Sequence, residues 1–495
     1  MGADDRPNII LITTDTQGWE MVSAYRRLSA VETPHIDALA ANGVLFENAF
    51  TAGPPCTPAR SAWYTGMPPN RNGAMCNETA VSRGVPFLAE ILGERGYRCR
   101  HIGKFHLDAA GYNGSGKCDG GFEAEGWYDL KNFLDEVGTD GPNRFGGWNK
   151  GLHDIEYCFA HRVADRAIDS LRTFGGGDDP FFLAVEFDEP HGPYICPPPY
   201  RGKYAATDVP VPETLGADLS GKPRLQQEYA AWIAEQTRNP ATPLAYYHRY
   251  FDCNAYVDYE FGRVLKAAEA YAGDNLVIIF TSDHGDHRGA FGLAPKGPTM
   301  YDHTIRVPFI VAGPIVADPG RRVSGLTSGT DLFATVLDLC GAPSGGAAAA
   351  SVSSGYTGVS LLPVLIGASR ETGREAAFIE YNRFGVKFEQ FRGFYPIRCV
   401  RTERWKLSIN LFDTDELYDL AEDPGEARNL IDDPSAARIR DELHDQLLVS
   451  MTESQDILRG PGWYERSWRA ASPHRFTGLL TTGAADNWED GKWEV

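Results

Sequence analysis

Residues 8–14 read NIILITT, an apolar run rich in β-branched side chains, and Asp15 follows it directly. A run of this length and composition is typical of a strand buried on both faces of a parallel sheet. Further strands are expected at 98–102, 181–187, 276–281 and 307–312, and helices at 33–43, 86–94, 154–174 and 246–271. This alternation predicts an α/β fold with a large, mostly parallel central sheet flanked by helices.

The pattern changes in the last quarter of the chain. Short strands are expected at 376–381, 397–401 and 405–411 without helices between them, followed by a helix at 433–451. We therefore predict two domains, a larger one at 1–364 and a smaller α+β domain at 365–495 with an antiparallel sheet. The smaller domain ends in a tryptophan-rich tail that contains Trp463, Trp468, Trp488 and Trp493.

Composition limits the function classes. The chain has 495 residues, 42% of them hydrophobic, and a formal net charge of −20. Such a charge disfavours binding along the phosphate backbone of nucleic acids. No apolar run is long enough to span a membrane. Nine scattered cysteines and the lack of a visible signal peptide lead us to expect a cytoplasmic protein, or a periplasmic or secreted one if a leader precedes this sequence.

Two of the predicted strands end in side chains that bind metals. Asp15 follows the first strand, and Asp283-His284 follows the strand at 276–281. Sites in open α/β sheets gather at the carboxyl ends of strands. Two carboxylates and an imidazole at this edge suit a hard divalent cation.

A third segment carries a candidate nucleophile. Residues 53–61 read GPPCTPARS, and a helix is expected from Thr57 to Thr65. Cys56 would then lie at a helix N-terminus, where backbone N–H groups favour an anionic substrate. Arg60 lies one turn further on and can reach back to a negative oxygen.

The Cys-x-Pro-x-Arg motif at Cys56, together with Asp15 and Asp283-His284, resembles the type I sulfatases of the alkaline phosphatase superfamily. The resemblance implies that a formylglycine-generating enzyme oxidises Cys56 to formylglycine. The hydrated aldehyde has two hydroxyls: one attacks sulfur, and the other then expels sulfate. It also implies one divalent metal held by Asp15, the residue at 56, Asp283 and His284, most simply Ca²⁺.

One position departs from the family pattern. A second aspartate usually follows the first, whereas this chain has Thr16 and then Gln17. Thr16 offers a weaker oxygen ligand, and Gln17 is the alternative. The missing charge weakens calcium binding or favours Mn²⁺.

The same resemblance assigns roles to four more residues. Residues 103–106 read GKFH and are similar to the family's Gly-Lys-x-His element. It implies that Lys104 neutralises a sulfate oxygen and that His106 positions or deprotonates the hydrated aldehyde. His191 and Lys296 would flank the leaving oxygen, with His191 as its proton donor.

Two further residues are candidate substrate contacts. Asn77 lies at the position of an asparagine in the related phosphonate monoester hydrolases, and His303 lies in a stretch similar to one in sulfatases. The alternative for His303 is that it holds a loop.

The sequence thus predicts a sulfuric ester hydrolase that cleaves a small-molecule or saccharide sulfate monoester. Two alternatives stay open: a phosphonate monoester or phosphodiester hydrolase on the same scaffold, and a catalytically silent binding protein of this fold. The sequence also leaves open a homo-oligomeric state.

Overall fold

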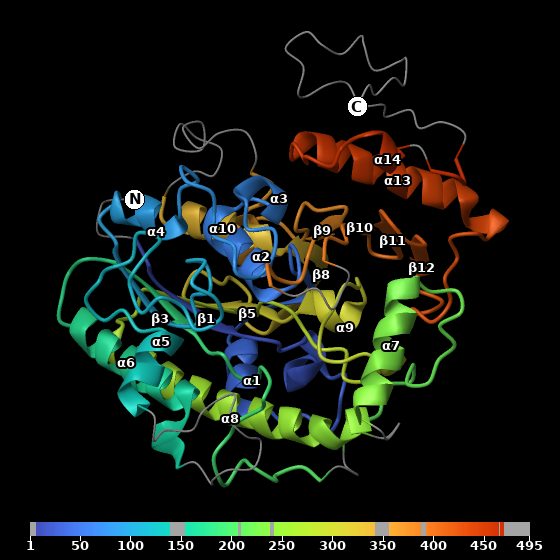
Figure 1. Cartoon of the computed structure of the whole chain (residues 1–495). Helices are drawn as coiled ribbons and strands as arrows, with labels where there is room; N and C mark the ends of the chain where they lie inside the picture. The colour runs from blue at the N-terminus through green and yellow to red at the C-terminus, as the bar shows by residue number, and fades with distance from the viewer. Residues whose placement is uncertain are drawn as a thin grey trace.

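An eight-stranded sheet forms the centre of the protein (Figure 1). The computed structural model describes residues 6–138, 154–205, 209–237, 242–341, 356–387, 393–464 and 466–469. The sheet strands, in spatial order, are β3 (Arg98–Gly103), β4 (Phe181–Glu186), β1 (Asn8–Thr14), β5 (Leu276–Ser282), β7 (Phe309–Ala312), β2 (Gly43–Phe50) and β6 (Arg306–Val307), with β8 (Arg321–Ser328) also paired to β2.

Strand β1 lies inside the sheet, as its apolar sequence predicts. Its Leu11 pairs in parallel register with Ala184 of β4 on one side and with Ile279 of β5 on the other. Strands β3, β4, β1 and β5 are all parallel, whereas β7 is antiparallel to both β5 and β2. Strand β2 therefore runs in the same direction as β1.

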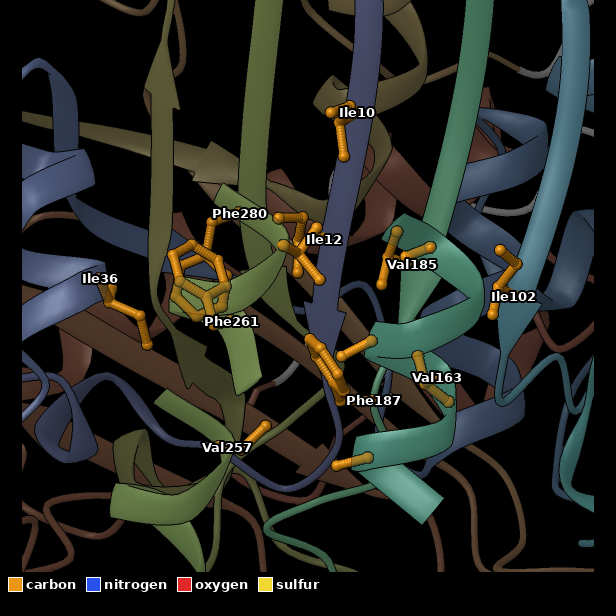
Figure 2. Packing of buried hydrophobic residues seen from close by; sticks show 14 of the residues in the cluster. Ile10, Ile12, Ile36, Ile102, Val163, Val185, Phe187, Val257, Phe261 and Phe280 are labelled. Atoms are coloured by element: carbon orange, nitrogen blue, oxygen red, sulfur yellow. The ribbon is translucent and has the colours of Figure 1, made fainter. Parts of the chain in front are cut away.

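Helices cover both faces of this sheet. On one face, Ile10 and Ile12 pack with Val163 of α6 (Phe159–Phe174) and Phe261 of α8 (Thr242–Tyr271), as Figure 2 shows. Helices α1 (Pro34–Ala41) and α5 (Leu130–Val137) extend this layer. The opposite face is covered by α2 (Cys56–Thr65), α4 (Leu88–Gly93), α10 (Gly329–Leu339) and α12 (Leu362–Leu365).

A smaller antiparallel sheet follows in the last part of the chain. Its strands, in spatial order, are β12 (Glu416–Asp419), β11 (Trp405–Asn410), β10 (Ile397–Arg401) and β9 (Ala377–Tyr381). Helix α13 (Ala437–Glu453) and the short α14 (Pro461–Tyr464) pack against it through Leu447 and Trp463. The two sheets together confirm the predicted fold class. The domain boundary at 364/365 stays a prediction.

Some details differ from the sequence-based expectation. The strand expected at 307–312 is two short strands separated by Pro308, which has no N–H to donate to a ladder. Strands β2 and β8 were not expected. Among the described residues, the other helices are α3 (Pro69–Asn72), α7 (Arg224–Thr237) and α9 (Asp302–Ile305). Short 3₁₀ turns occur at Trp19–Met21, Ser23–Tyr25, Ile155–Tyr157, Ala290–Gly292 and Pro434–Ala436.

The tryptophans of the last segment, the cysteines and the helix lengths can also be compared with the expectations. Trp463 is buried and Trp468 packs edge-on against His444, while Trp488 and Trp493 lie outside the described residues. All nine cysteines are free thiols. In the part of the chain that the structure describes, none of the helices has the length and apolar character to cross a membrane.

Candidate active site

The candidate site forms where parallel strands end. Asp15 follows β1, Asp283 follows β5, Lys104 follows β3, and Glu186 is the last residue of β4. Strand β2 runs in the same direction, and the loop after it leads to Cys56. The carboxyl ends of parallel strands share one edge of a sheet, so five separate segments deliver their side chains to one place.

Cys56 is the first residue of α2, a helix whose residues are all buried. Its Sγ lies 3.0 Å from Nζ of Lys296, 3.4 Å from Nε2 of His284 and 3.8 Å from Nζ of Lys104. Asp15 Oδ1 is 3.9 Å away. The sulfur therefore sits between cations and a carboxylate at the positive end of a helix dipole.

Four buried side chains form a cluster that suits a metal. Ligand atoms of Asp15, Cys56, Asp283 and His284 all lie within 4.8 Å of one another. Nδ1 of His284 lies 2.9 Å from the carbonyl oxygen of Gly285, so Nδ1 carries the proton and Nε2 is left to bind a cation. Two carboxylates and one imidazole nitrogen fit a divalent ion.

Thr16 and Gln17 lie beside this cluster but turn their side chains to other partners. Thr16 Oγ1 donates to Asp15 Oδ1 at 2.7 Å, and the Thr16 backbone N–H donates to Asp283 at 3.0 Å. The side-chain Nε2 of Gln17 donates to Oδ1 of Asn254 at 2.6 Å. Thr16 thus orients both carboxylates, and Gln17 is directed away from the cluster. The Thr16 backbone has a φ of 68°, a strained value for a β-branched residue.

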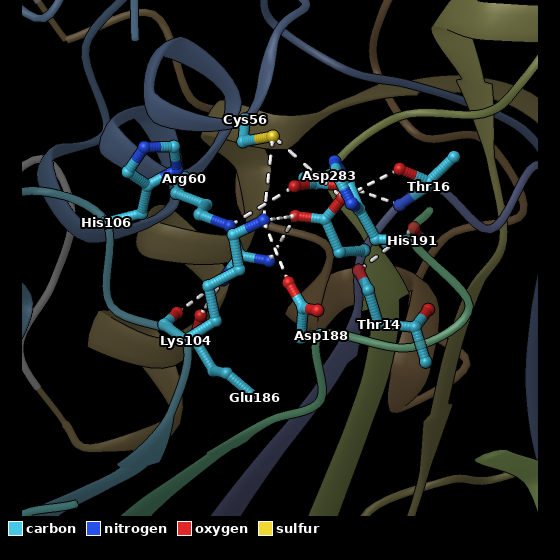
Figure 3. A network of polar contacts seen from close by, with 12 residues as sticks. Thr14, Thr16, Cys56, Arg60, Lys104, His106, Glu186, Asp188, His191 and Asp283 are labelled. Atoms are coloured by element: carbon cyan, nitrogen blue, oxygen red, sulfur yellow. Dashed lines mark hydrogen bonds and ion pairs between the residues drawn. The ribbon is translucent and has the colours of Figure 1, made fainter. Parts of the chain in front are cut away.

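Arg60 binds the carboxylates rather than facing open space. Its Nη2 lies 3.1 Å from Asp15, its Nε lies 3.2 Å from Asp283, and its Nη1 binds Glu186 (Figure 3). Nη1 also donates to the backbone carbonyl of Lys104 at 2.6 Å. The guanidinium is wholly buried, so it can fix the ligands in place.

The lysines set the charge of the site. Lys104 Nζ lies 2.5 Å from Asp15 and 3.2 Å from Asp188. Burial raises the pKa of the Cys56 thiol, and so does Asp15, but the surrounding positive charges, among them Lys104, Lys296 and His284, lower it, and the net pKa lies well below its usual value. The same lysines, against burial, keep the pKa of Asp15 low. The carboxyl of Asp283 differs: burial and the charge of Asp15 raise its pKa to about 7.

Gly103 explains how Lys104 reaches this position. Its φ is 120°, and a Cβ there would lie 1.9 Å from the carbonyl oxygen of Glu186. Only glycine fits at this close approach of β3 to β4.

The rings of both histidines, His191 and His106, lie near Tyr112. Nε2 of His191 faces Asp15 Oδ1 at 3.9 Å, and its Nδ1 lies 2.6 Å from the carbonyl oxygen of Gly192. His106 is buried, and its ring packs against Tyr112. Burial lowers the pKa of both imidazoles.

Asn77 and His303, the two candidate substrate contacts, both bind other protein groups. Asn77 Oδ1 accepts the backbone N–H of Thr57 at 3.0 Å, which caps α2 directly after Cys56. His303 Nδ1 lies 3.1 Å from Glu20, which also binds Arg288. The carboxylate of Glu20 therefore holds the His303 side chain in a separate charged group.

Three residues of the site were missed from the sequence. Glu186 and Asp188 end and follow β4, and Tyr112 comes from the loop after β3. Glu186 and Asp188 could have been predicted as site residues from their position at the end of a buried strand, just before the segment that contains His191. Nothing in the sequence distinguishes Tyr112 from other loop tyrosines.

The fold thus places a buried cysteine within a cluster of side chains that could hold a metal, at the carboxyl ends of parallel strands. The sulfatase family model matches residues 7–342, and the model for the C-terminal part of N-sulphoglucosamine sulphohydrolase matches 289–453. The first match spans most of the chain. The protein belongs to the sulfatase family and is an enzyme of that class.

Comparisons with individual proteins agree with this family assignment. The chain is 34% identical to the uncharacterized sulfatase YidJ of Escherichia coli over 98% of this chain and 95% of that protein. It is 28% identical to the Delta 4,5-hexuronate-2-O-sulfatase of Bacteroides thetaiotaomicron, over 92% and 91%. The solved phosphonate monoester hydrolase of Agrobacterium radiobacter superposes with a TM-score of 0.75 at 26% identity, over 91% and 97%.

Proposed function

We propose that the protein hydrolyses a sulfate monoester with a formylglycine nucleophile made from Cys56. One observation carries this proposal. The Cys56 side chain begins a buried helix and lies within the ligand cluster of Asp15, Asp283 and His284, with Lys296 Nζ 3.0 Å from its sulfur. A buried structural thiol would have apolar neighbours instead.

Asp15, Asp283, His284 and the residue at 56 would hold one divalent metal. The donor set fits, because two carboxylate groups and an imidazole Nε2 converge in a buried site. We favour Ca²⁺, with Mn²⁺ as the alternative, since Thr16 adds no negative charge. When bound, the ion would polarise the ester oxygens and the nucleophile as a Lewis acid.

The surrounding side chains then have separate tasks. Lys104 and Lys296 neutralise charge on the sulfuryl oxygens, since both ammonium groups lie within 4 Å of Cys56 Sγ. His106 orients or deprotonates the nucleophile. His191 reacts in its doubly protonated form, in which Nδ1 keeps the proton held by the Gly192 carbonyl and Nε2 gives its proton to the leaving oxygen, leaving a neutral ring. Arg60 is a positioning residue, because its guanidinium contacts the metal-binding carboxylates.

For the substrate we propose a saccharide sulfate or a small sulfate ester. A relative that covers nearly the whole chain is named for removing a 2-O-sulfate from a hexuronate. The second candidate is a phosphonate monoester or phosphodiester, favoured by the 0.75 TM-score to a phosphonate monoester hydrolase. Steady-state kinetics on matched 4-nitrophenyl sulfate, phosphodiester and phosphonate esters decide between them. A preference of several orders of magnitude for a phosphorus ester would overturn the first choice.

A catalytically silent protein is the third possibility. Coexpression with a formylglycine-generating enzyme should lower the mass of the Cys56 peptide by about 18 Da, the difference between a thiol-bearing carbon and an aldehyde. If the matured protein turned over none of these esters, the silent alternative would replace our proposal.

Cys56→Ala tests the nucleophile directly. We expect turnover to fall to the background rate, because no other side chain of the site supplies the attacking group. The melting temperature should change by only a few degrees, since a small buried side chain is replaced by another. Cys118 is exposed, so Cys118→Ala is the matched control and should keep full activity. Aggregation of Cys56→Ala would indicate a structural thiol instead.

A further inference from the structure

Tyr112 contacts three of the proposed catalytic side chains at once. Lys104 Nζ lies 4.1 Å from the centre of its ring. The rings of His106 and His191 lie 5.4 and 5.2 Å away, centre to centre. The residue is half-buried and comes from the loop after β3. One side chain outside the family motifs therefore contacts Lys104, His106 and His191 together.

The hydroxyl of Tyr112 joins two of these groups. It donates a hydrogen bond to Asp188 Oδ1 and lies 3.2 Å from Nδ1 of His191. Asp188 Oδ1 also lies 3.2 Å from Lys104 Nζ. Figure 3 draws the contact between the Lys104 ammonium and Asp188 as a dashed line. Asp188 and Tyr112 thus connect the loop after β3 with the segment after β4.

This arrangement fixes the orientation of His191. A carbonyl oxygen only accepts hydrogen bonds, so the 2.6 Å contact with Gly192 places a proton on Nδ1. The Tyr112 oxygen is a second acceptor for the N–H at Nδ1, because the Tyr112 hydroxyl donates its own hydrogen to Asp188. The opposite nitrogen, Nε2, is then turned toward Asp15 and the metal-type cluster.

We infer that Tyr112, held by Asp188, is a positioning residue that aims His191 Nε2 at the leaving oxygen and holds Lys104 beside the reacting ester. This inference rests on the proposed function of His191 as the proton donor. Loss of the hydroxyl removes one of the contacts that fix Nδ1 of the imidazole, so the ring is held less firmly and can rotate. Misplacement by about 1 Å is enough to cost two orders of magnitude in rate.

Tyr112→Phe tests the hydroxyl while keeping the ring. Proton donation matters more as the leaving alcohol becomes less acidic. We expect kcat to fall by less than about 3-fold with a 4-nitrophenyl ester and by about 10- to 100-fold with an unactivated alkyl ester, with KM little changed. The series uses whichever ester class the matured enzyme hydrolyses, so it does not depend on sulfate being the substrate.

Two variants complete the design. His191→Asn should show the same dependence on the leaving group, and adding Tyr112→Phe to it should cost no more, because both act through one group. Tyr356 is half-buried among Phe333 and its neighbours, and its hydroxyl has no hydrogen-bond partner among the described residues. Tyr356→Phe is the matched control and should leave the whole series unchanged.

The outcomes separate the inference from the proposed function. An equal loss across the series, or no loss, would show that the hydroxyl does not act through His191 and would overturn the inference. If His191→Asn itself lacked the leaving-group dependence, the proposed proton donor would be wrong. A crystal structure of Tyr112→Phe decides the geometry independently of activity: we expect a rotated His191 ring, and an unmoved ring would refute positioning by Tyr112.

Discussion

Arg60 is the residue at which the carboxylates of the site meet. It lies within 3.2 Å of Asp15 and Asp283 and also binds Glu186, and all of these side chains are fully buried. A buried ion pair adds little net stability compared with an apolar replacement of the whole group. Removal of one partner is different, because the remaining charges are left without compensation.

Arg60→Gln should therefore destabilise the protein strongly. We expect a loss of about 3–5 kcal/mol in the free energy of unfolding, because three buried carboxylates lose their shared cation. Urea and thermal unfolding, followed by circular dichroism, measure the change. Arg438 pairs with Glu442 on the surface, 81% and 51% exposed, and Arg438→Gln should cost only about 0–1 kcal/mol. Similar losses for both variants would contradict this account of the network.

At the scale of single residues, the sequence predicted which side chains gather at the site better than it predicted their individual hydrogen-bond and ion-pair partners. Asp15 and Asp283 follow neighbouring strands, so their closeness follows from strand order. The partners of Arg60 and Gln17 depend on side-chain direction, which spacing alone does not give. Glu186 was missed because an acid at the end of an apolar strand has no motif.

At the scale of elements, long apolar runs were predicted well and mixed ones were not. The sequence gives β1 its observed limits, residues 8–14, since every position is apolar or β-branched apart from Asn8. Strand β2 includes Glu47 and Asn48, where its pairing with β8 shifts register. Strand β8 mixes exposed, half-buried and buried residues in its first five positions, ends in three buried ones, and carries two arginines. Such strands resemble loops until their neighbours are known.

Helix α13 is held to α14 by a buried histidine. The Nε2 of His444 binds the carbonyl oxygen of Trp463, and its Nδ1 lies 2.9 Å from Nη1 of Arg469. Arg469 can only donate, so Nδ1 accepts and the imidazole is neutral. Burial lowers the pKa of His444 to about 4.

This histidine should make stability sensitive to acid. Its pKa is lower in the folded protein, so the unfolded chain binds a proton first, and stability is lost as pH falls from about 6.5 to about 4. A shift of this size corresponds to about 3 kcal/mol. His444→Gln cannot titrate, and its melting temperature should fall less than that of the wild type between pH 7 and pH 4.5. Parallel curves for the two proteins would refute the role of His444.

At the scale of the whole molecule, the chain that follows strand β9 of the smaller sheet contacts the residue that caps α2. The connection after β9 pairs with Asn77 through backbone hydrogen bonds, from Asn77 to Phe384 at 3.1 Å and from Val386 to Asn77 at 3.3 Å. The Asn77 side chain in turn caps α2 beside Cys56. The last part of the chain therefore supports the site as well as its own core. Sequence reasoning predicted both sheets but not this link, because a single backbone bridge leaves no pattern.

The metal proposal has a consequence for global stability. A ligand that binds only the folded state at 100 times its dissociation constant stabilises that state by about 2.7 kcal/mol. We therefore expect a chelator to lower the melting temperature of the matured protein, and Ca²⁺ or Mn²⁺ to restore it. The cluster joins the ends of β1 and β5 to the start of α2, so the effect should involve the main unfolding transition.

Two variants make this measurement specific to the cluster. Asp283→Asn removes one of the two carboxylate charges, so the gain in melting temperature on adding metal should shrink by at least half, because hard cations depend on anionic oxygen. Asp318 is exposed and lies outside the cluster, and Asp318→Asn should keep the full gain. If both variants responded to metal like the wild type, the ion would bind elsewhere, and the four buried side chains around Cys56 would hold no metal.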